Sequence, residues 1–307
     1  MIDQFGRSID YLRLSVTDKC NLSCQTCVHQ DCDEHIEREA LLTFSEMDKI
    51  VGTLSELGIE KVRITGGEPL LRANIEQLIA LLCRHGGINE VTLTTNGILL
   101  ADKAEQLKLA GLRRVNVNLN TLRTERYQEM TQGGNLNDVL NGIEAAKKAG
   151  LTPVKINVCI MHGVNEDEVD DFIQFSIREN VEVRFVEWVS NSQDGTNLFV
   201  SNNDIRNLIP NLTPISGSES QTCNRQYTIS DSKAKIGFIS PISQRFCGSC
   251  NCIRLTADGF LKGCLHDKEE VAIKQMLGNE RLLEHVLRRS IFQKDEFFNF
   301  EDPLNLE

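Results

Sequence analysis

The chain has 307 residues, and its 33 Lys and Arg against 44 Asp and Glu give a formal net charge of −11. This acidic balance argues against nucleic-acid binding, which depends on neutralising phosphates with basic side chains. It does not exclude a small phosphorylated ligand, because a few local cations can bind one inside an acidic protein. A hydrophobic content of 40% with 25% charged residues is typical of a globular protein and excludes a disordered or collagen-like chain.

Strand and helix patterns alternate through the first two-thirds of the chain. Short apolar runs predict strands over residues 11–16, 62–65, 91–95, 115–119, 154–161 and 183–188. Amphipathic segments predict helices over residues 44–57, 74–84, 102–109, 136–148 and 166–178. Such alternation is typical of parallel β/α units that close wholly or partly into a barrel, with functional residues at the C-terminal ends of the strands.

The alternation ends near residue 189. Beyond a polar loop, the remaining predicted elements are helices over residues 203–210 and 281–289 and strands over 237–241 and 255–261. We therefore expect two domains, a barrel over residues 1–189 and a second region over 190–307.

The chain contains 11 cysteines, an odd number that cannot all pair in disulfides. No stretch approaches the roughly 18 consecutive apolar residues of a membrane span, and the first residues lack the apolar core of a signal peptide. We therefore expect no membrane association and a cytoplasmic location, where thiols stay reduced. Reduced cysteines in this number indicate a metal-binding protein.

Cys20, Cys24 and Cys27 form a C-x3-C-x2-C pattern directly after the first predicted strand. Three thiolates on one loop can bind a four-iron cluster and leave one iron open for a substrate or cofactor. Zinc is an alternative, because His29 could supply a fourth ligand, and unliganded buried cysteines are another. The spacing resembles the signature of radical S-adenosylmethionine (SAM) enzymes.

The motif Gly66-Gly67-Glu68-Pro69 follows the second predicted strand. Glycine allows close backbone approach, and a carboxylate can accept hydrogen bonds from a ligand ammonium group. Alone, the motif could be an ordinary turn. Beside the first cysteine triad, it resembles the strip that holds the methionyl amino group of SAM.

Cys247, Cys250 and Cys264 form a second triad, spaced C-x2-C-x13-C. A zinc ribbon completed by Cys252 or His266 is one interpretation. We favour a second four-iron cluster, whose open iron could hold a substrate.

These motifs, in this order, resemble the GTP 3′,8-cyclase family of molybdenum-cofactor biosynthesis. The matching segments are residues 5–7, 13–18, 41–44, 63–72, 93–97, 155–158, 184–187 and 254–259. The resemblance implies an α/β fold, a radical SAM partial (β/α)6 barrel with a C-terminal iron–sulfur cluster domain. It also implies two [4Fe–4S] clusters and SAM as cofactors.

In this family, a 5′-deoxyadenosyl radical made from SAM removes the 3′-hydrogen of GTP, and C3′ then attacks C8 of the guanine. The resemblance therefore implies a lyase that makes (8S)-3′,8-cyclo-7,8-dihydroguanosine 5′-triphosphate. It implies an electron donor such as flavodoxin and, as the next enzyme, cyclic pyranopterin monophosphate synthase. It is compatible with a homodimer.

Carried over residue by residue, the resemblance assigns roles to three groups of positions. The cluster ligands would be Cys20, Cys24, Cys27, Cys247, Cys250 and Cys264, the first triad acting in catalysis with Arg13 and Arg254. The SAM-binding residues would be Thr26, Gly66, Gly67, Glu68, Asn118 and Val189. The substrate-binding residues would be Arg13, Lys61, Arg63, Thr94, Lys155, Arg184, Cys252, Ile253 and Arg254. A triphosphate needs such charge-assisted donors, and arginine can bind it bidentately.

The sequence departs from the family at several of these positions. The departures are Thr26 for an aromatic residue, Asn118 and Asn120 for Ser and Asp, Val189 for Met, Cys252 for Arg, and residues 302–307 for a Gly-Gly tail. A divergent paralogue acting on another nucleotide or phosphorylated substrate is therefore the alternative to GTP cyclisation. A non-enzymatic iron–sulfur or zinc protein is a third interpretation. Cys83 and Cys159 are expected to be small core residues, and Cys32 and Cys223 have no assigned role.

Overall fold

The computed structural model describes residues 1–27, 36–189, 198–215, 224–229, 232, 234–264 and 269–296. Its centre is a curved row of parallel strands, β1 (Tyr11–Ser15), β2 (Lys61–Thr65), β3 (Glu90–Thr95), β4 (Arg114–Asn118), β5 (Lys155–Val158) and β6 (Glu182–Val186). Each strand pairs in parallel with the next one in the chain. This arrangement is the predicted partial barrel.

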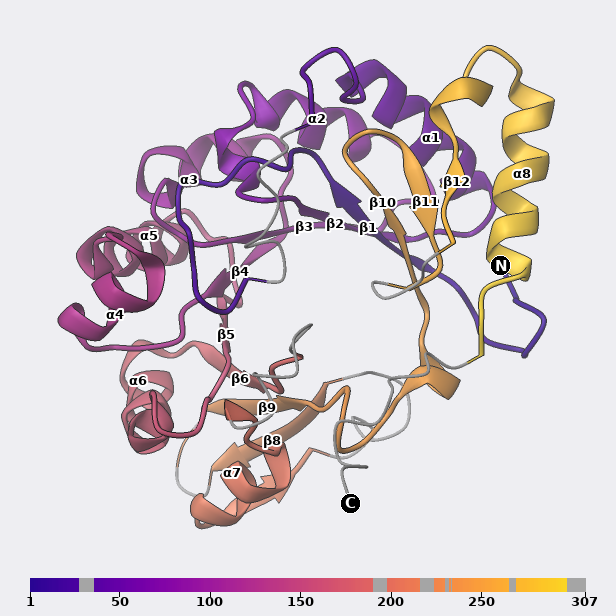
Figure 1. The fold of residues 1–307 in the computed structure, drawn as a ribbon. Helices are drawn as coiled ribbons and strands as arrows, with labels where there is room; N and C mark the ends of the chain where they lie inside the picture. Colours follow the sequence, from indigo (N-terminus) through magenta and orange to yellow (C-terminus); the bar gives the residue numbers. More distant parts are fainter. Residues whose placement is uncertain are drawn as a thin grey trace.

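Helices cover the outer face of this curved sheet (Figure 1). They are α1 (Phe44–Glu56), α2 (Ile75–Leu82), α3 (Leu100–Leu109), α4 (Thr124–Thr131), α5 (Leu136–Lys148) and α6 (Val169–Glu179). The apolar side chains of the strands, such as Leu12 and Leu14 on β1, are fully buried in the core. Because successive strand residues point to opposite faces, the polar residues between them face the barrel interior.

The C-terminal region extends the sheet at both edges. Its elements are α7 (Asn202–Leu208), β7 (Leu212–Pro214), β8 (Arg225–Ile229), β9 (Lys235–Ile239), β10 (Cys252–Leu255), β11 (Phe260–Lys262), β12 (Val271–Ala272) and α8 (Glu280–Phe292). Strand β9 pairs in parallel with β6, and β10 pairs in parallel with β1. The full order is β12-β11-β10-β1-β2-β3-β4-β5-β6-β9-β8-β7. Short 3₁₀ turns lie at η1 (Pro69–Leu71), η2 (Glu166–Glu168), η4 (Cys247–Ser249) and η5 (Lys274–Met276).

The fold confirms the predicted α/β barrel and corrects several elements. The single strand predicted over 255–261 is wrong, because the chain reverses at Gly259 (φ +95°) and forms the antiparallel pair β10–β11. Helix α4 and strands β7, β8 and β12 were not predicted, since they are short and lack clear periodicity. The division at residue 189 stays a prediction. None of the described helices is long and apolar enough to cross a membrane.

Candidate active site

Three arginines lie side by side on the inner face of the sheet. Arg13 on β1 is the register partner of both Arg63 on β2 and Arg254 on β10. We call these three residues the arginine row. The sequence predicted each of them as a substrate contact, and strand pairing brings them to one level although Arg254 is far from the others in the chain.

Arg63 and Arg254 of the arginine row are desolvated, and none of the three arginines forms an ion pair with a carboxylate in the described part of the chain. Burial, with the positive charge of Arg13 nearby, lowers the pKa of Arg254 to about 10, and burial likewise lowers the pKa of Arg63. The Arg63 guanidinium lies over the ring of Tyr11, 5.2 Å from its centroid. Within the described residues, the Nε atoms of Arg13 and Arg63 are buried without a hydrogen-bond partner. Such groups are costly unless an anion binds them.

A second group of charges lies across the barrel on β5 and β6. The Glu182 carboxylate forms ion pairs with Lys155 Nζ at 2.9 Å and with Arg184 Nε at 2.6 Å. We call these three residues the Glu182 cluster. Burial would raise the pKa of Glu182, but Arg184 and Lys155 outweigh it and lower that pKa to about 2. Burial, and then the charge of Arg184, lower the pKa of Lys155 to about 8.

Two other predicted substrate residues lie on the inner face as well. Lys61 lies at the start of β2 and forms an ion pair with Asp10, with 3.2 Å between Nζ and Oδ2. Thr94 on β3 accepts a hydrogen bond from Asn116 Nδ2 at 3.4 Å. Lys61 therefore has a carboxylate partner, unlike the arginine row.

Cys252 and Ile253 point to opposite faces of β10. Cys252 shares the inner face with Arg254, two residues later, and burial raises the pKa of its thiol although Arg254 and Arg13 lower it. Ile253 is 1% exposed and belongs to the hydrophobic core. The Ile253 side chain therefore does not face the barrel interior, and the substrate-binding role predicted for position 253 stays a prediction.

The Gly66-Gly67-Glu68-Pro69 motif, which we call the glycine strip, packs directly against the loop that carries the first cysteine triad. Gly67 N donates to Thr17 O at 2.7 Å, and Glu68 N donates to Lys19 O at 2.8 Å. A Cβ at Gly67 would lie 2.2 Å from Lys19 O. Glycine is thus required here by the approach of the cysteine loop itself, one residue before Cys20.

The Glu68 side chain ties this strip to the end of β3. It is 1% exposed, and its carboxylate accepts hydrogen bonds from Leu70 N, Thr95 Oγ1 and Asn96 N at 3.0, 2.8 and 2.7 Å. Within the described residues, three of its four lone-pair positions accept hydrogen bonds, which leaves one for a ligand donor. Asn96 in turn donates to Asn21 Oδ1 at 2.8 Å, beside Cys20. Asn96 lies in the family-matching segment 93–97 and in the turn dipeptide Asn96-Gly97, but no site role was predicted for it from the sequence.

The thiols of the first triad lie close enough to influence one another. Burial, and then the charges of the neighbouring Cys20 and Cys27 thiols, raise the pKa of Cys24 to about 12. Such a set is unfavourable as free thiolates but suits a metal centre, whose positive charge deprotonates coordinating thiols. The first triad therefore fits the cluster that the sequence predicted.

The turn after β4 is held against the cysteine loop. Asn120 Nδ2 donates to Thr26 Oγ1 at 3.2 Å, and Asn120 Oδ1 accepts from Cys159 N at 2.9 Å. Thr26 and Asn120 are two of the positions where the sequence departs from the resembled family, so the departures contact each other. Asn118 accepts a hydrogen bond from Asn157 Nδ2 at 3.0 Å, which engages its amide oxygen.

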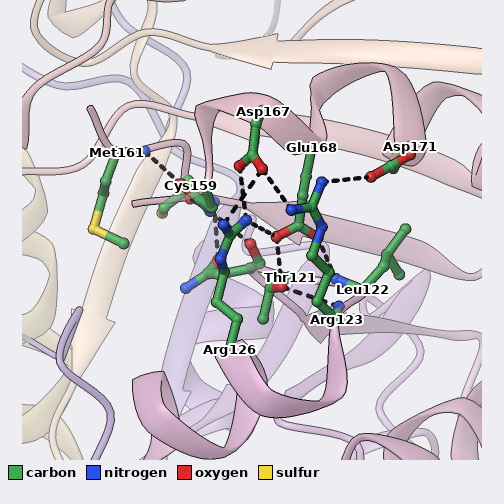
Figure 2. Close-up of polar contacts among 11 residues, drawn as sticks. Thr121, Leu122, Arg123, Arg126, Cys159, Met161, Asp167, Glu168 and Asp171 are labelled. Carbon is green, nitrogen blue, oxygen red and sulfur yellow. Dashed lines mark hydrogen bonds and ion pairs between the residues drawn. The ribbon is translucent and has the colours of Figure 1, made fainter. Parts of the chain in front are cut away.

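Figure 2 shows Glu168 and its contacts with Thr121 and Leu122 of the same turn. Glu168 is fully buried, pairs with Arg126, and accepts from Thr121 Oγ1 and Leu122 N, both at 2.6 Å. The turn after β4 is therefore held rigidly at the C-terminal end of the barrel. Val189 lies beyond the end of β6 and is half-buried.

The second triad lies beside the arginine row. Cys250 N donates to Cys247 O at 3.1 Å, and the thiols of Cys264 and Cys250 raise the pKa of Arg254 against the larger effect of burial. Within the described residues, no three Cys, His, Asp or Glu side chains are grouped to hold a single metal ion.

Cys83 is exposed at the end of α2, so its predicted place in the core is wrong. Cys159 is partly exposed. The proposed zinc ligands His29 and His266, the cysteines Cys32 and Cys223, and the tail 302–307 lie outside the described residues.

Comparison with known proteins shows the superfamily to which the fold belongs. The model of the radical SAM superfamily matches residues 14–176, and that of the molybdenum cofactor synthesis C-terminal domain matches residues 181–300. The fold resembles Streptococcus suis SuiB bound to S-adenosylmethionine, with a TM-score of 0.71 and 14% identity, over 96% of this chain and 69% of that one. This barrel with its cysteine triad is thus a radical SAM barrel.

Within that class, full-length relatives define the family. The GTP 3′,8-cyclase of Peptoclostridium acidaminophilum is 39% identical over 98% of this chain and 94% of its own length. That of Alkaliphilus oremlandii is 42% identical over 96% and 93%. The chain belongs to the GTP 3′,8-cyclase family of the radical SAM superfamily. Membership in this family supports SAM and [4Fe–4S] clusters as the cofactors, while the assignment of each cysteine triad to a cluster stays a prediction.

Proposed function

We propose that this protein converts GTP to (8S)-3′,8-cyclo-7,8-dihydroguanosine 5′-triphosphate in molybdenum-cofactor biosynthesis. The observation that carries the proposal is the arginine row, three cations at one level inside a radical SAM barrel, of which Arg63 and Arg254 are desolvated. An interior of this kind suits a triphosphate, which binds arginines through charge-assisted bidentate hydrogen bonds.

The first triad would hold the cluster that binds SAM. Gly66, Gly67 and Glu68 would line the methionyl end, while Asn118 would direct its amide N–H groups outward, since Asn157 already binds its oxygen. Thr26 and Val189 would complete the SAM site. When bound, the cluster and SAM supply the radical that removes the 3′-hydrogen of GTP.

The substrate would lie between the two walls of the barrel. The arginine row would bind it on one side, while Lys155 and Arg184 would exchange part of their pairing with Glu182 for phosphate oxygens on the other. Lys61, Thr94 and the thiol of Cys252 would line the rest. The second triad would hold a cluster whose open iron binds the guanine. Correct placement of C3′ and C8 within such a cavity is the protein's main contribution to the rate.

We also propose a cytoplasmic location, because the described cysteines are free thiols that need a reducing compartment. An electron donor such as flavodoxin would reduce the clusters, and cyclic pyranopterin monophosphate synthase would take the product. A homodimer is part of this proposal, and sedimentation of the anaerobic protein would test it.

The test is anaerobic incubation of reconstituted protein with reductant, SAM and GTP. Formation of 5′-deoxyadenosine and cyclised GTP in equal amounts is the expected result. Iron content should be about eight per chain, the number for two four-iron clusters.

Cys252 favours one alternative, a paralogue with the same radical chemistry on another phosphorylated substrate. It lies on the inner face beside Arg254 and Arg13, where the family has another arginine. Formation of 5′-deoxyadenosine without cyclised GTP would support this alternative and contradict GTP cyclisation.

A further inference from the structure

Arg7, in the N-terminal segment, has a fully engaged and buried guanidinium. Its side chain is 4% exposed, and Nε pairs with Asp3 at 2.6 Å. One terminal nitrogen donates to Cys247 O at 2.9 Å and Glu296 O at 3.0 Å. The other donates to Lys294 O at 3.2 Å and Asp295 O at 2.6 Å. All five N–H groups of the guanidinium thus have acceptors.

These contacts join three distant parts of the chain at one point. Figure 1 shows the N-terminal segment beside the end of α8, and Gln4 N donates to Phe292 O at 3.0 Å. The segment 294–296 follows α8 directly, and Cys247 begins the turn that leads into β10. Arg7 therefore fixes the backbone of the first cysteine of the second triad to both the start of the chain and the segment after α8.

The same segment also holds the third cysteine of that triad. Lys294 is 5% exposed, and its Nζ donates to Gly263 O at 2.6 Å, the carbonyl directly before Cys264. Cys247 and Cys264 are 17 residues apart in the sequence, yet residues 294–296 connect to both through two buried cations.

We propose that Arg7 and Lys294 are positioning residues for the second cysteine triad. Together they hold the backbone at Cys247 and at Gly263 in fixed relation, so that the thiols are arranged before a cluster binds. This inference rests on the proposed assignment of that triad to a [4Fe–4S] cluster. Groups that orient metal ligands without touching the metal typically change metal affinity 10–100-fold when removed.

The test uses the whole chain with the first triad disabled by Cys20→Ser, Cys24→Ser and Cys27→Ser, so that all bound iron reports on the second triad. In this background we expect about four irons per chain. Adding Arg7→Lys or Lys294→Met should speed the loss of this iron to a chelator about tenfold or more. Lysine keeps the charge of Arg7 but cannot reach all its acceptors, and methionine keeps the apolar stem of Lys294.

Lys108→Met is the matched control. Lys108 Nζ also donates to a backbone carbonyl, Gly150 O at 2.7 Å, but on the α3–α5 side of the barrel. This variant should release iron at the parental rate. In the otherwise unmodified chain, Lys294→Met should not change the iron bound by the first triad or the SAM cleavage that depends on that iron. A general loss of stability would reduce both.

Chelation rates in both test variants equal to those of Lys108→Met would overturn the proposal. A parent without iron at the second triad would also overturn it, by removing its premise. If the unmodified protein does not cyclise GTP while the second triad still binds about four irons, only the proposed substrate is contradicted. The chelation assay contains neither SAM nor GTP and does not depend on the substrate. If Arg7→Lys does not fold, Lys294→Met alone decides the outcome.

Discussion

Both walls of the barrel interior carry cations but hold them differently. In the arginine row, Arg13, Arg63 and Arg254 lie side by side, with no ion pair to a carboxylate in the described part of the chain. In the Glu182 cluster, Lys155 and Arg184 share one buried carboxylate. One wall is therefore ready for an anion, while the other must exchange partners to bind it.

The difference between the two walls predicts different contributions to the stability of the ligand-free protein. A desolvated cation without a partner destabilises the folded protein. A paired cation destabilises it only when its partner is removed. Replacements on the two walls should consequently have opposite effects on the ligand-free protein, and the predictions below test this contrast.

The largest effect is expected for Arg254→Met. We expect GTP affinity to fall by about 4 kcal/mol, roughly 1000-fold, because a buried charge partner of the phosphates is lost. The ligand-free protein should melt at the same or a higher temperature, since a desolvated cation is removed. Calorimetric titration and anaerobic thermal melts measure the two quantities. Arg113→Met, at an exposed position, is the control. A clearly lower melting temperature for Arg254→Met but not for Arg113→Met would contradict the proposed difference between the two walls.

Glu182→Gln should have the opposite effect on stability. Removing the carboxylate leaves Lys155 and Arg184 buried without their anion, so we expect the free energy of unfolding to fall by about 3 kcal/mol. GTP should then raise the melting temperature more than it does in the unmodified protein, because its phosphates replace the lost charge. Denaturant unfolding with and without GTP measures this.

The control for this prediction is Glu144→Gln, which removes only an exposed pair with Lys148 on α5. Exposed pairs contribute little to stability, so this variant should unfold like the parent. Equal stability of Glu182→Gln and Glu144→Gln would mean that the Glu182 cluster is not an energetic unit.

Cys252→Arg should extend the arginine row. The Cys252 thiol shares the inner face with Arg254, so an added guanidinium should tighten GTP binding by about 1.5 kcal/mol, roughly tenfold. Cys83→Arg, at the exposed end of α2, controls for added charge. Unchanged affinity would show that position 252 does not contact the substrate.

The smallest effect is the pH dependence of GTP binding. Burial and the charge of Arg184 lower the pKa of Lys155 to about 8 in the ligand-free protein, and phosphate would favour the protonated form and raise this pKa. Binding then takes up a proton above pH 8, so affinity should fall as pH rises, by roughly fivefold or about 1 kcal/mol between pH 8 and 9. Titration in buffers of different ionisation enthalpy counts the protons, and Lys155→Met should lose this dependence.

The sequence predicted the barrel and both cysteine triads because each depends on local pattern. Strands β1 to β6 have apolar alternation that repeats, and the cysteines of the first triad lie within eight residues of one another. Element ends were harder to predict, and the β10–β11 reversal was missed although the turn dipeptide Asp258-Gly259 indicates it. At Ile253 the motif match gave a position but not the face of the strand, and only the structure places its side chain in the core.

The contacts between distant segments could not be predicted at all. Nothing local indicates that Asn120 binds Thr26, that Asn96 lies beside Cys20, or that Arg7 binds the carbonyl of Cys247. Each pairing depends on which strands become neighbours and in which register.

The sequence by itself therefore determined the class of chemistry: a radical SAM barrel with two thiolate triads and enough cations for a phosphorylated substrate. Only the tertiary structure decided how these cations differ. Strand register places Arg254 and Arg63 on the two sides of Arg13, and places Lys155 opposite Glu182, which lies two residues before Arg184 on the same strand. The physical reason is that the energy of a buried charge depends on its neighbours in space, and register chooses the neighbours that come from other strands.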